Sequence, residues 1–184
     1  MTEIAERYRN VANQFTSRVR AVPASEWDNP SPCEGWVARD IVRHLVEWVP
    51  GFLSSGAGVE MPPLLSVDVD PIGAWEGLDR ALQSLLDDPE SAAREFFNEH
   101  TGRHSLEDAV GMFILGDVLV HTWDLARATN LDETLDADEV RRMLEGLEPM
   151  ADTLSESGQF GPRVEVRADA DEQTRLLAAS GRQP

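Results

Sequence analysis

The chain has 184 residues, of which 41% are apolar, enough for one domain with a real hydrophobic core. Sixteen basic residues face 34 acidic ones, and the net charge of −18 argues against nucleic-acid and anionic-membrane partners, because clustered positive charge binds both. All 16 basic residues are arginine, which excludes Schiff-base and P-loop lysine chemistry.

The remaining composition predicts a cytoplasmic protein. Cys33 is the single cysteine, so no intramolecular disulfide can form, which suits a reducing compartment. The N-terminus, MTEIAERYRN, lacks the apolar region of a signal peptide and is typical of a helix start. The most apolar stretch, Met112 to Ala126, is interrupted by ionisable residues, so no membrane span is predicted.

The first half of the chain shows three segments with the apolar spacing of amphipathic helices. The first covers residues 3–22, and the second runs from about Val37 to Leu53. Between them, residues 27–36 (WDNPSPCEGW) form a shaped loop, because prolines and a glycine interrupt the pattern. The third helix is predicted over residues 71–86, with a proline at its first position.

The second half continues with two further helices. Residues 92–104 are ambiguous and are predicted to be irregular or weakly extended. A long helix is predicted over residues 105–129, opened by a capping box of Ser105 and Asp108 and closed by Asn130 in the left-handed conformation. Asp136 with Glu139 should cap a fifth helix that reaches about Leu154.

The predicted fold class is all-α: a four-helix bundle with extra short helices and a small irregular C-terminal tail. The bundle should occupy residues 1–158. The tail, residues 159–184, should pack on the bundle and contain a helical turn around residues 173–179.

Ionisable residues interrupt the inward face of the helix predicted over residues 105–129. This face comprises Leu106, Val110, Phe113, Asp117, His121, Asp124 and Ala128. Burying a lone carboxylate costs several kcal/mol or shifts its pKa until it is neutral, so such a cluster needs compensation.

A divalent metal ion would supply that compensation. Asp117 and His121 lie one helical turn apart, and the second helix presents His44 between Ile41 and Trp48 on its apolar face. Two imidazoles and one carboxylate leave coordination positions open, as in catalytic metal sites. The alternatives are a hydrogen-bonded core histidine and a buried Asp117–His121 ion pair.

Other polar residues near this pattern have weaker signals. Asp124 could orient a ligand histidine or pair with Arg127 or Arg43, and we favour the orienting role. Glu47 could be a fourth ligand, but its spacing favours a solvent-facing side chain.

Three further residues could carry chemistry. Cys33 could be a nucleophile beside a histidine, although a small buried apolar group in a tight loop is favoured. His100 and His104 fall in the irregular segment and are predicted to lie at the surface.

Two runs of sequence carry a family resemblance. PSPCEGWVARDIVRHLV, residues 30–46, and GDVLVHTWDLARATN, residues 116–130, together resemble the mycothiol-dependent maleylpyruvate isomerase-like branch of the DinB superfamily. The closing QTRLLAASGRQP, residues 173–184, is similar to the tail of small metal-binding members of that branch. The resemblance covers nearly the whole chain and implies a DinB-like four-helix bundle that binds a divalent ion, usually zinc. It places the metal ligands on His44, Asp117 and His121.

The chain departs from the family pattern in three places. Asp117 stands where the isomerase has a longer glutamate, and 184 residues leave little room for the isomerase's further C-terminal domain. Val37 replaces a threonine and removes a helix cap worth about 1 kcal/mol, while Asp40 still favours the positive end of the helix.

The resemblance implies a metal-dependent isomerase or S-transferase that uses a small-molecule thiol such as mycothiol. The thiolate would add to an electrophilic substrate such as an unsaturated acid, whose carboxylate Arg39, Arg43 or Arg127 could receive. The residues themselves predict only the metal, and zinc, nickel and iron all suit the donor set. A homodimer is compatible with this interpretation.

Two alternatives remain open. A non-catalytic metal-binding or stress-response module is favoured by the missing C-terminal domain. Metal-assisted hydrolysis would need Asp124 or Glu47 as a general base.

Overall fold

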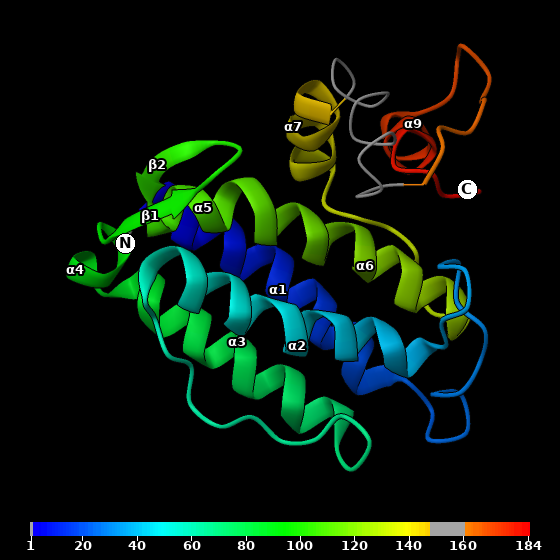
Figure 1. Cartoon of the computed structure of the whole chain (residues 1–184). Coiled ribbons are helices and arrows are strands. Elements are labelled where there is room, and N and C mark those ends of the chain that lie inside the picture. Colours follow the sequence, from blue (N-terminus) through cyan, green and yellow to red (C-terminus); the bar gives the residue numbers. More distant parts are fainter. Residues whose placement is uncertain (1, 148–160) are drawn as a thin grey trace.

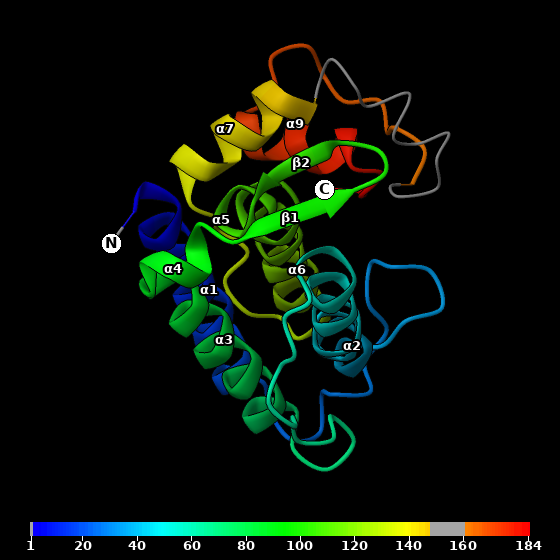
Figure 2. The same cartoon turned by 60° about the vertical axis from the view of Figure 1, so that its left-hand side comes forward.

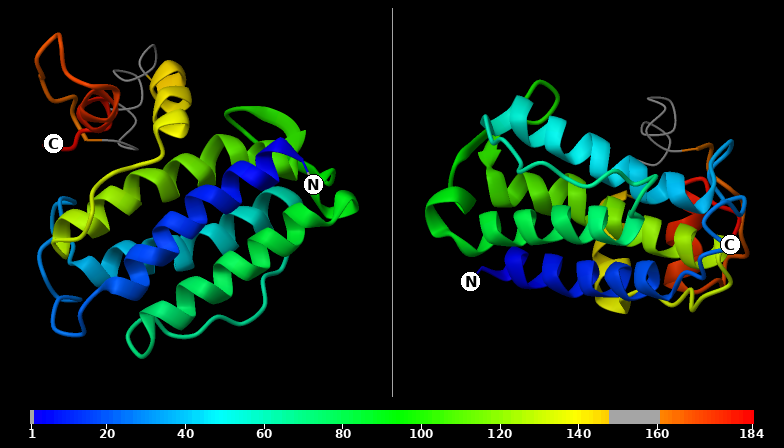
Figure 3. Two further views of the ribbon diagram at one scale, coloured as in Figure 1. Left: turned by 180° about the vertical axis from the view of Figure 1, so that it is seen from behind. Right: turned by 90° about the horizontal axis from the view of Figure 1, so that it is seen from below.

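Four long helices lie side by side in the computed structural model, which describes residues 2–147 and 161–184 (Figures 1 and 3). They are α1 (Glu3–Ala21), α2 (Ala38–Ala57), α3 (Pro71–Asp87) and α6 (Leu115–Ala128). The packing pairs α1–α3, α3–α2, α2–α6 and α6–α1 close a ring around the apolar core. The predicted helical character is confirmed.

Local sequence explains where the first helices begin and end. Thr2 caps α1 by accepting a hydrogen bond from the Ala5 N–H. Val37 offers no side-chain cap to α2, as predicted, but the Asp40 carboxylate accepts the Val37 N–H. Helix α2 continues past the predicted end at Leu53 to Ala57, and Gly58 caps it with a φ of 61°, which suits glycine at a helix end.

The helix predicted over residues 105–129 contains an irregular turn. Ser105 caps α5 (Leu106–Ala109), a π-helical turn covers Val110–Ile114, and α6 follows without a break. A π turn changes the direction in which later side chains point, and such turns occur often at functional sites. Asn130 ends the run with φ 54°, as predicted.

A small hairpin corrects the all-α prediction. After the short helix α4 (Pro89–Ala92), strands β1 (Glu95–Asn98) and β2 (Gly102–Ser105) pair antiparallel, essentially within the segment that we predicted to be irregular or weakly extended, and the extended alternative holds. Phe96 anchors the hairpin: its buried ring lies 4.7 Å from that of Phe52 and against Gly56, where any Cβ would collide with it. This long-range contact has no counterpart in local periodicity.

The two C-terminal helices pack on each other, and the first of them also contacts the bundle (Figure 2). Helix α7 (Ala137–Leu147), capped by Asp136 as predicted, packs on α9 (Glu172–Ala179). The helical turn predicted around residues 173–179 is confirmed as α9. An ion pair between Arg7 and the buried Glu139 (2.7 Å) joins α7 to α1. The predicted helix end at Leu154 and the boundary at residue 158 lie outside the described residues.

One helix among the described residues, Leu106–Ala128, is long and apolar enough to cross a membrane by length and composition. However, 72% of its most apolar window is buried inside the protein. The central helix of a bundle passes the same test, so this is weak evidence for a membrane span.

Candidate metal centre

The structure brings His44, Asp117 and His121 together between α2 and α6. His44 Nε2 lies 3.1 Å from Asp117 Oδ2, and His121 Nε2 lies 3.4 Å from Asp117 Oδ1. One ligand atom from each residue falls within 4.8 Å of the other two. The i, i+4 spacing on α6 and the inward face of α2 thus place all three donors as the sequence predicted.

The cluster is closed on one side and open on the other. The His121 side chain is only 5% exposed, whereas those of His44 and Asp117 are 31% and 26% exposed. A metal ion could therefore be held by the protein on its inner side and meet a small molecule on its outer side.

Two tryptophans flank the site. Trp48 Nε1 donates a hydrogen bond to Asp117 Oδ2 at 2.9 Å, which orients the carboxylate. The Trp36 ring lies 5.2 Å from that of His44 and 6.0 Å from that of His121, stacked on the latter.

Asp124 occupies the position that an orienting carboxylate requires. Its Oδ2 lies 2.8 Å from His121 Nδ1, on the far side of the imidazole from Asp117. If His121 donates its Nδ1–H to Asp124, the Nε2 lone pair is left facing Asp117 and His44.

The predicted arginine partners of Asp124 are wrong. Arg182 of the C-terminal tail donates to both carboxylate oxygens, at 2.9 and 3.3 Å. Arg43 pairs instead with Asp40 and Asp68. The C-terminus lies at the same end of the bundle as the loop before α2, which brings Arg182 to the site (Figures 1 and 3).

Arg127, the other predicted partner of Asp124, also points elsewhere. Its guanidinium pairs with Glu133 at 2.9 Å and lies over the Trp123 ring.

Cys33 is part of the same polar network, so our prediction of a buried apolar group is wrong. The side chain is part-exposed, and its Sγ lies 3.5 Å from Asp124 Oδ2 and 3.9 Å from Arg182 Nη2. The loop is folded toward α6 by the turn at Gly35 (φ 78°) and by a bridge between Pro30 and Val37. Nothing in the local pattern signals this approach.

Cys33, His121 and Asp124 form a second group with ligand-like spacing. Here Arg182 already places a cation 2.9 Å from Asp124. Repulsion by that guanidinium disfavours a second positive ion, so the trio with His44 is the better metal site.

The charges of the cluster support each other. Burial by itself would raise the pKa of Asp117, but the charge and hydrogen bond of His121, with the hydrogen bond of His44, hold that pKa well below its ordinary value. Burial likewise opposes ionisation of Asp124, and His121 and Arg182 outweigh it to lower the pKa. For His121, burial lowers the pKa, but the charge and hydrogen bond of Asp117, with the hydrogen bonds of Asp124 and Cys33, together raise it well above its ordinary value. A divalent ion would replace the proton of His121 as the compensating charge.

The other candidate residues lie away from the cluster. Glu47 is mostly exposed, as predicted. His100 is exposed as expected, whereas His104 is part-buried in the hairpin with its Nε2 2.8 Å from the Thr101 carbonyl.

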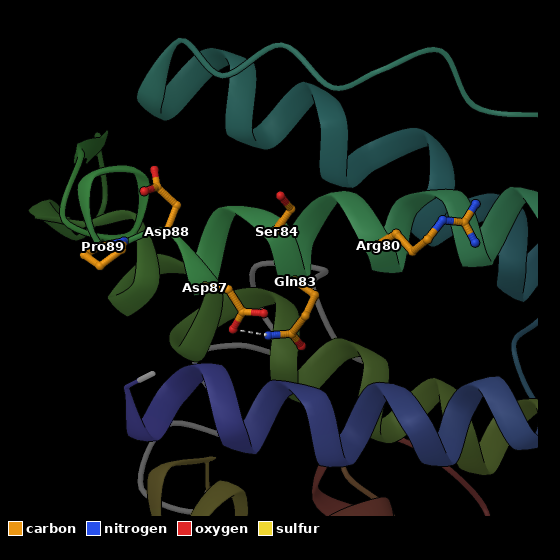
Figure 4. Close-up of a pocket in the computed structure, with 6 residues that line it drawn as sticks. All are labelled: Arg80, Gln83, Ser84, Asp87, Asp88 and Pro89. Carbon is orange, nitrogen blue, oxygen red and sulfur yellow. Dashed lines mark hydrogen bonds between the residues drawn. The ribbon is translucent and has the colours of Figure 1, made fainter.

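A surface groove of about 670 Å³ runs along α3 (Figure 4). Its lining consists of Arg80, Gln83, Ser84, Asp87, Asp88 and Pro89. The groove shares no lining residue with the metal centre, and Asp87 is engaged by Gln83 (3.2 Å) and by Arg9 (2.8 Å).

Two facing helices bring two imidazoles and a carboxylate together. The chain is therefore a helical-bundle protein with a candidate metal site. Residues 8–126 match the model of the mycothiol maleylpyruvate isomerase N-terminal domain, and the chain belongs to this family. The matched range includes all three predicted ligands, and the resemblance seen in the sequence is confirmed.

Similar proteins add no assigned activity. The chain is 25% identical over 140 residues to the uncharacterized proteins MT0763 and Rv0738 of Mycobacterium tuberculosis, strains CDC 1551 / Oshkosh and H37Rv. Each match covers 71% of this chain and 70% of the relative. No solved structure matches the chain.

Proposed function

We propose that the protein binds one divalent metal ion through His44, Asp117 and His121 and acts as a thiol-dependent isomerase or S-transferase. The proposal of a metal ion rests on one observation: three ligand atoms on two facing helices lie within 4.8 Å of one another. The donor chemistry fits, because two neutral imidazoles and a carboxylate suit zinc, nickel and iron, and zinc is the usual ion of the family that the chain resembles.

The surrounding residues have defined roles in this proposal. Asp124 holds His121 so that Nε2 faces the site, and Trp48 holds one oxygen of Asp117. The outer side of His44 and Asp117 stays accessible to a small molecule. When bound, the ion would stabilise the thiolate of a small-molecule thiol near neutral pH.

The proposal that a thiol takes part in the reaction rests on family membership. The family is named for mycothiol, a low-molecular-weight thiol, and the metal site falls inside the matched range. The alternative of a non-catalytic metal-binding module makes a different prediction for thiol addition and is separated by experiment.

Metal analysis tests the first part of the proposal. Protein reconstituted with zinc and dialysed should hold one equivalent. His44→Ala should lose it while keeping its helical circular dichroism, because His44 is part-exposed and contributes little to the core. His100→Ala, an exposed histidine on the hairpin turn, is the matched control and should keep its metal. Full zinc occupancy of His44→Ala would refute the assigned ligand set.

Cobalt substitution tests whether a thiol binds the metal. Mycothiol should change the visible absorption of the cobalt protein, because a sulfur ligand alters the metal's electronic transitions. An unchanged spectrum at saturating mycothiol would favour the non-catalytic module.

A further inference from the structure

Aromatic rings form a continuous rim beside the candidate metal centre. From Trp36 the rings run through His44 to Trp48, Phe52 and Phe113, with successive centroids 5.2, 5.9, 5.3 and 5.3 Å apart. Every member of this aromatic rim is only part-buried, so its rings can meet a ligand as well as the core. Part-exposed rings at such spacing favour flat apolar partners by stacking.

One polar group of the rim, the Trp48 indole N–H, is already occupied. The indole N–H of Trp48 donates to Asp117, so this hydrogen-bond donor is not left for a ligand.

The arginines around the site are each held by carboxylates. On α2, Arg39 pairs with Asp28 at 3.5 Å, and Arg43 pairs with Asp40 and Asp68. Arg127 and Arg182, already described, pair with acidic partners as well. A substrate carboxylate would have to displace one of these partners.

The local charge makes such an exchange unfavourable. Exposed Glu34 and Glu47 lie in the loop before α2 and on α2 itself, and the whole chain carries a net charge of −18. The acidic protein surface repels an anionic substrate during its approach, although a bound divalent ion would attract it at close range; a neutral substrate meets neither effect.

We propose that the co-substrate is a flat, uncharged electrophile that stacks on the aromatic rim, and that it is not a carboxylic acid. This inference rests on the proposed function and names its substrate class. In the reaction, a thiol adds across an activated C=C bond: sulfur bonds to one carbon and the proton goes to the other, so nothing is oxidised or reduced. The specificity comes from Trp36, in the loop just before α2, and from Phe52 on α2.

A matched pair of ligands tests the charge preference. Benzylideneacetone is a neutral aromatic enone, and 4-carboxybenzylideneacetone is the same enone with one carboxylate. Equilibrium dialysis against the full chain should show at least tenfold tighter binding of the neutral enone. Equal or tighter binding of the carboxylate would overturn the proposal.

Variants locate the binding site. Trp36→Leu and Phe52→Leu should each weaken binding of the neutral enone about fivefold, the usual worth of one aromatic stack. Phe97→Leu, an equivalent change at an exposed phenylalanine of the hairpin, should leave binding unchanged. Unaltered affinity in both rim variants, or a loss of carboxylate binding in Arg43→Gln, would each contradict the inference.

Dialysis with and without zinc separates this inference from the proposed function. The rim is built from side chains alone, so the neutral enone should also bind the metal-free protein. If zinc fails to bind but the neutral enone still binds more tightly than the carboxylate, the metal assignment is wrong and the aromatic rim remains supported as the substrate site. If zinc binds and the preference is absent, the proposed metal site stands and the substrate class is wrong.

Discussion

Replacing Arg182 with methionine should destabilise the fold by about 3 kcal/mol, although Arg182 is the third residue from the end of the sequence. Asp124 is fully buried and receives two hydrogen bonds from this guanidinium. Removing one partner of a buried ion pair costs about 3–5 kcal/mol, because the other charge stays buried. The lower end applies because His121 still contacts Asp124 at 2.8 Å.

Urea unfolding at pH 7, followed by circular dichroism, measures this loss. Arg141→Met is the control, since Arg141 is half-exposed and its pairs with Asp138 and Glu172 lie at the surface. It should cost less than about 1 kcal/mol. In an Asp124→Asn background, Arg182→Met should cost much less free energy of unfolding than in the wild type. The amide that replaces the carboxylate has no charge, so removing Arg182 leaves no buried charge unpaired.

Two results would refute the assignment of this pair. The first is an Arg182→Met cost no larger than that of Arg141→Met. The second is an equal cost with and without Asp124→Asn, which would mean that Arg182 acts through packing of its methylene groups.

Three further predictions concern the core, the pH response and the metal. Thr16→Val should cost about 1–3 kcal/mol in urea unfolding, because Trp75 loses the buried hydroxyl that accepts its indole N–H at 2.8 Å, and Thr16→Ser should keep most of that stability. Burial raises the pKa of Asp79, so the folded state binds its proton more tightly than the unfolded chain. The stability of the wild type relative to Asp79→Asn should therefore fall as pH rises from 3.8 through the raised pKa, and a difference that grows with pH would contradict this sign. Removing zinc with a chelator should lower the melting temperature of the wild type but not of His44→Ala, since only the folded wild type holds the ion; equal shifts in both would count against the ligand assignment.

Periodicity predicted the parts of the site that lie on single helices. The four-residue spacing of Asp117 and His121 puts both on one face of α6, and their places on apolar stripes turn them and His44 inward. The π turn before α6 was missed, because one wider turn barely alters an apolar pattern.

The parts that were wrong depend on contacts between distant segments. The hairpin is held by Phe96 against Phe52, and Cys33 reaches Asp124 from a loop 91 residues earlier in the chain. No spacing rule links such positions, so the sequence left the hairpin segment open between irregular and weakly extended and favoured a buried thiol at Cys33.

The helices, their caps and the inward direction of the three predicted ligands follow from the sequence alone, because helix geometry is determined by residues within one or two turns. The tertiary structure decided which charges meet. It brought Arg182 to Asp124 across 58 residues and left the arginines of α2 bound to acidic neighbours, because ion pairing depends on distance in space.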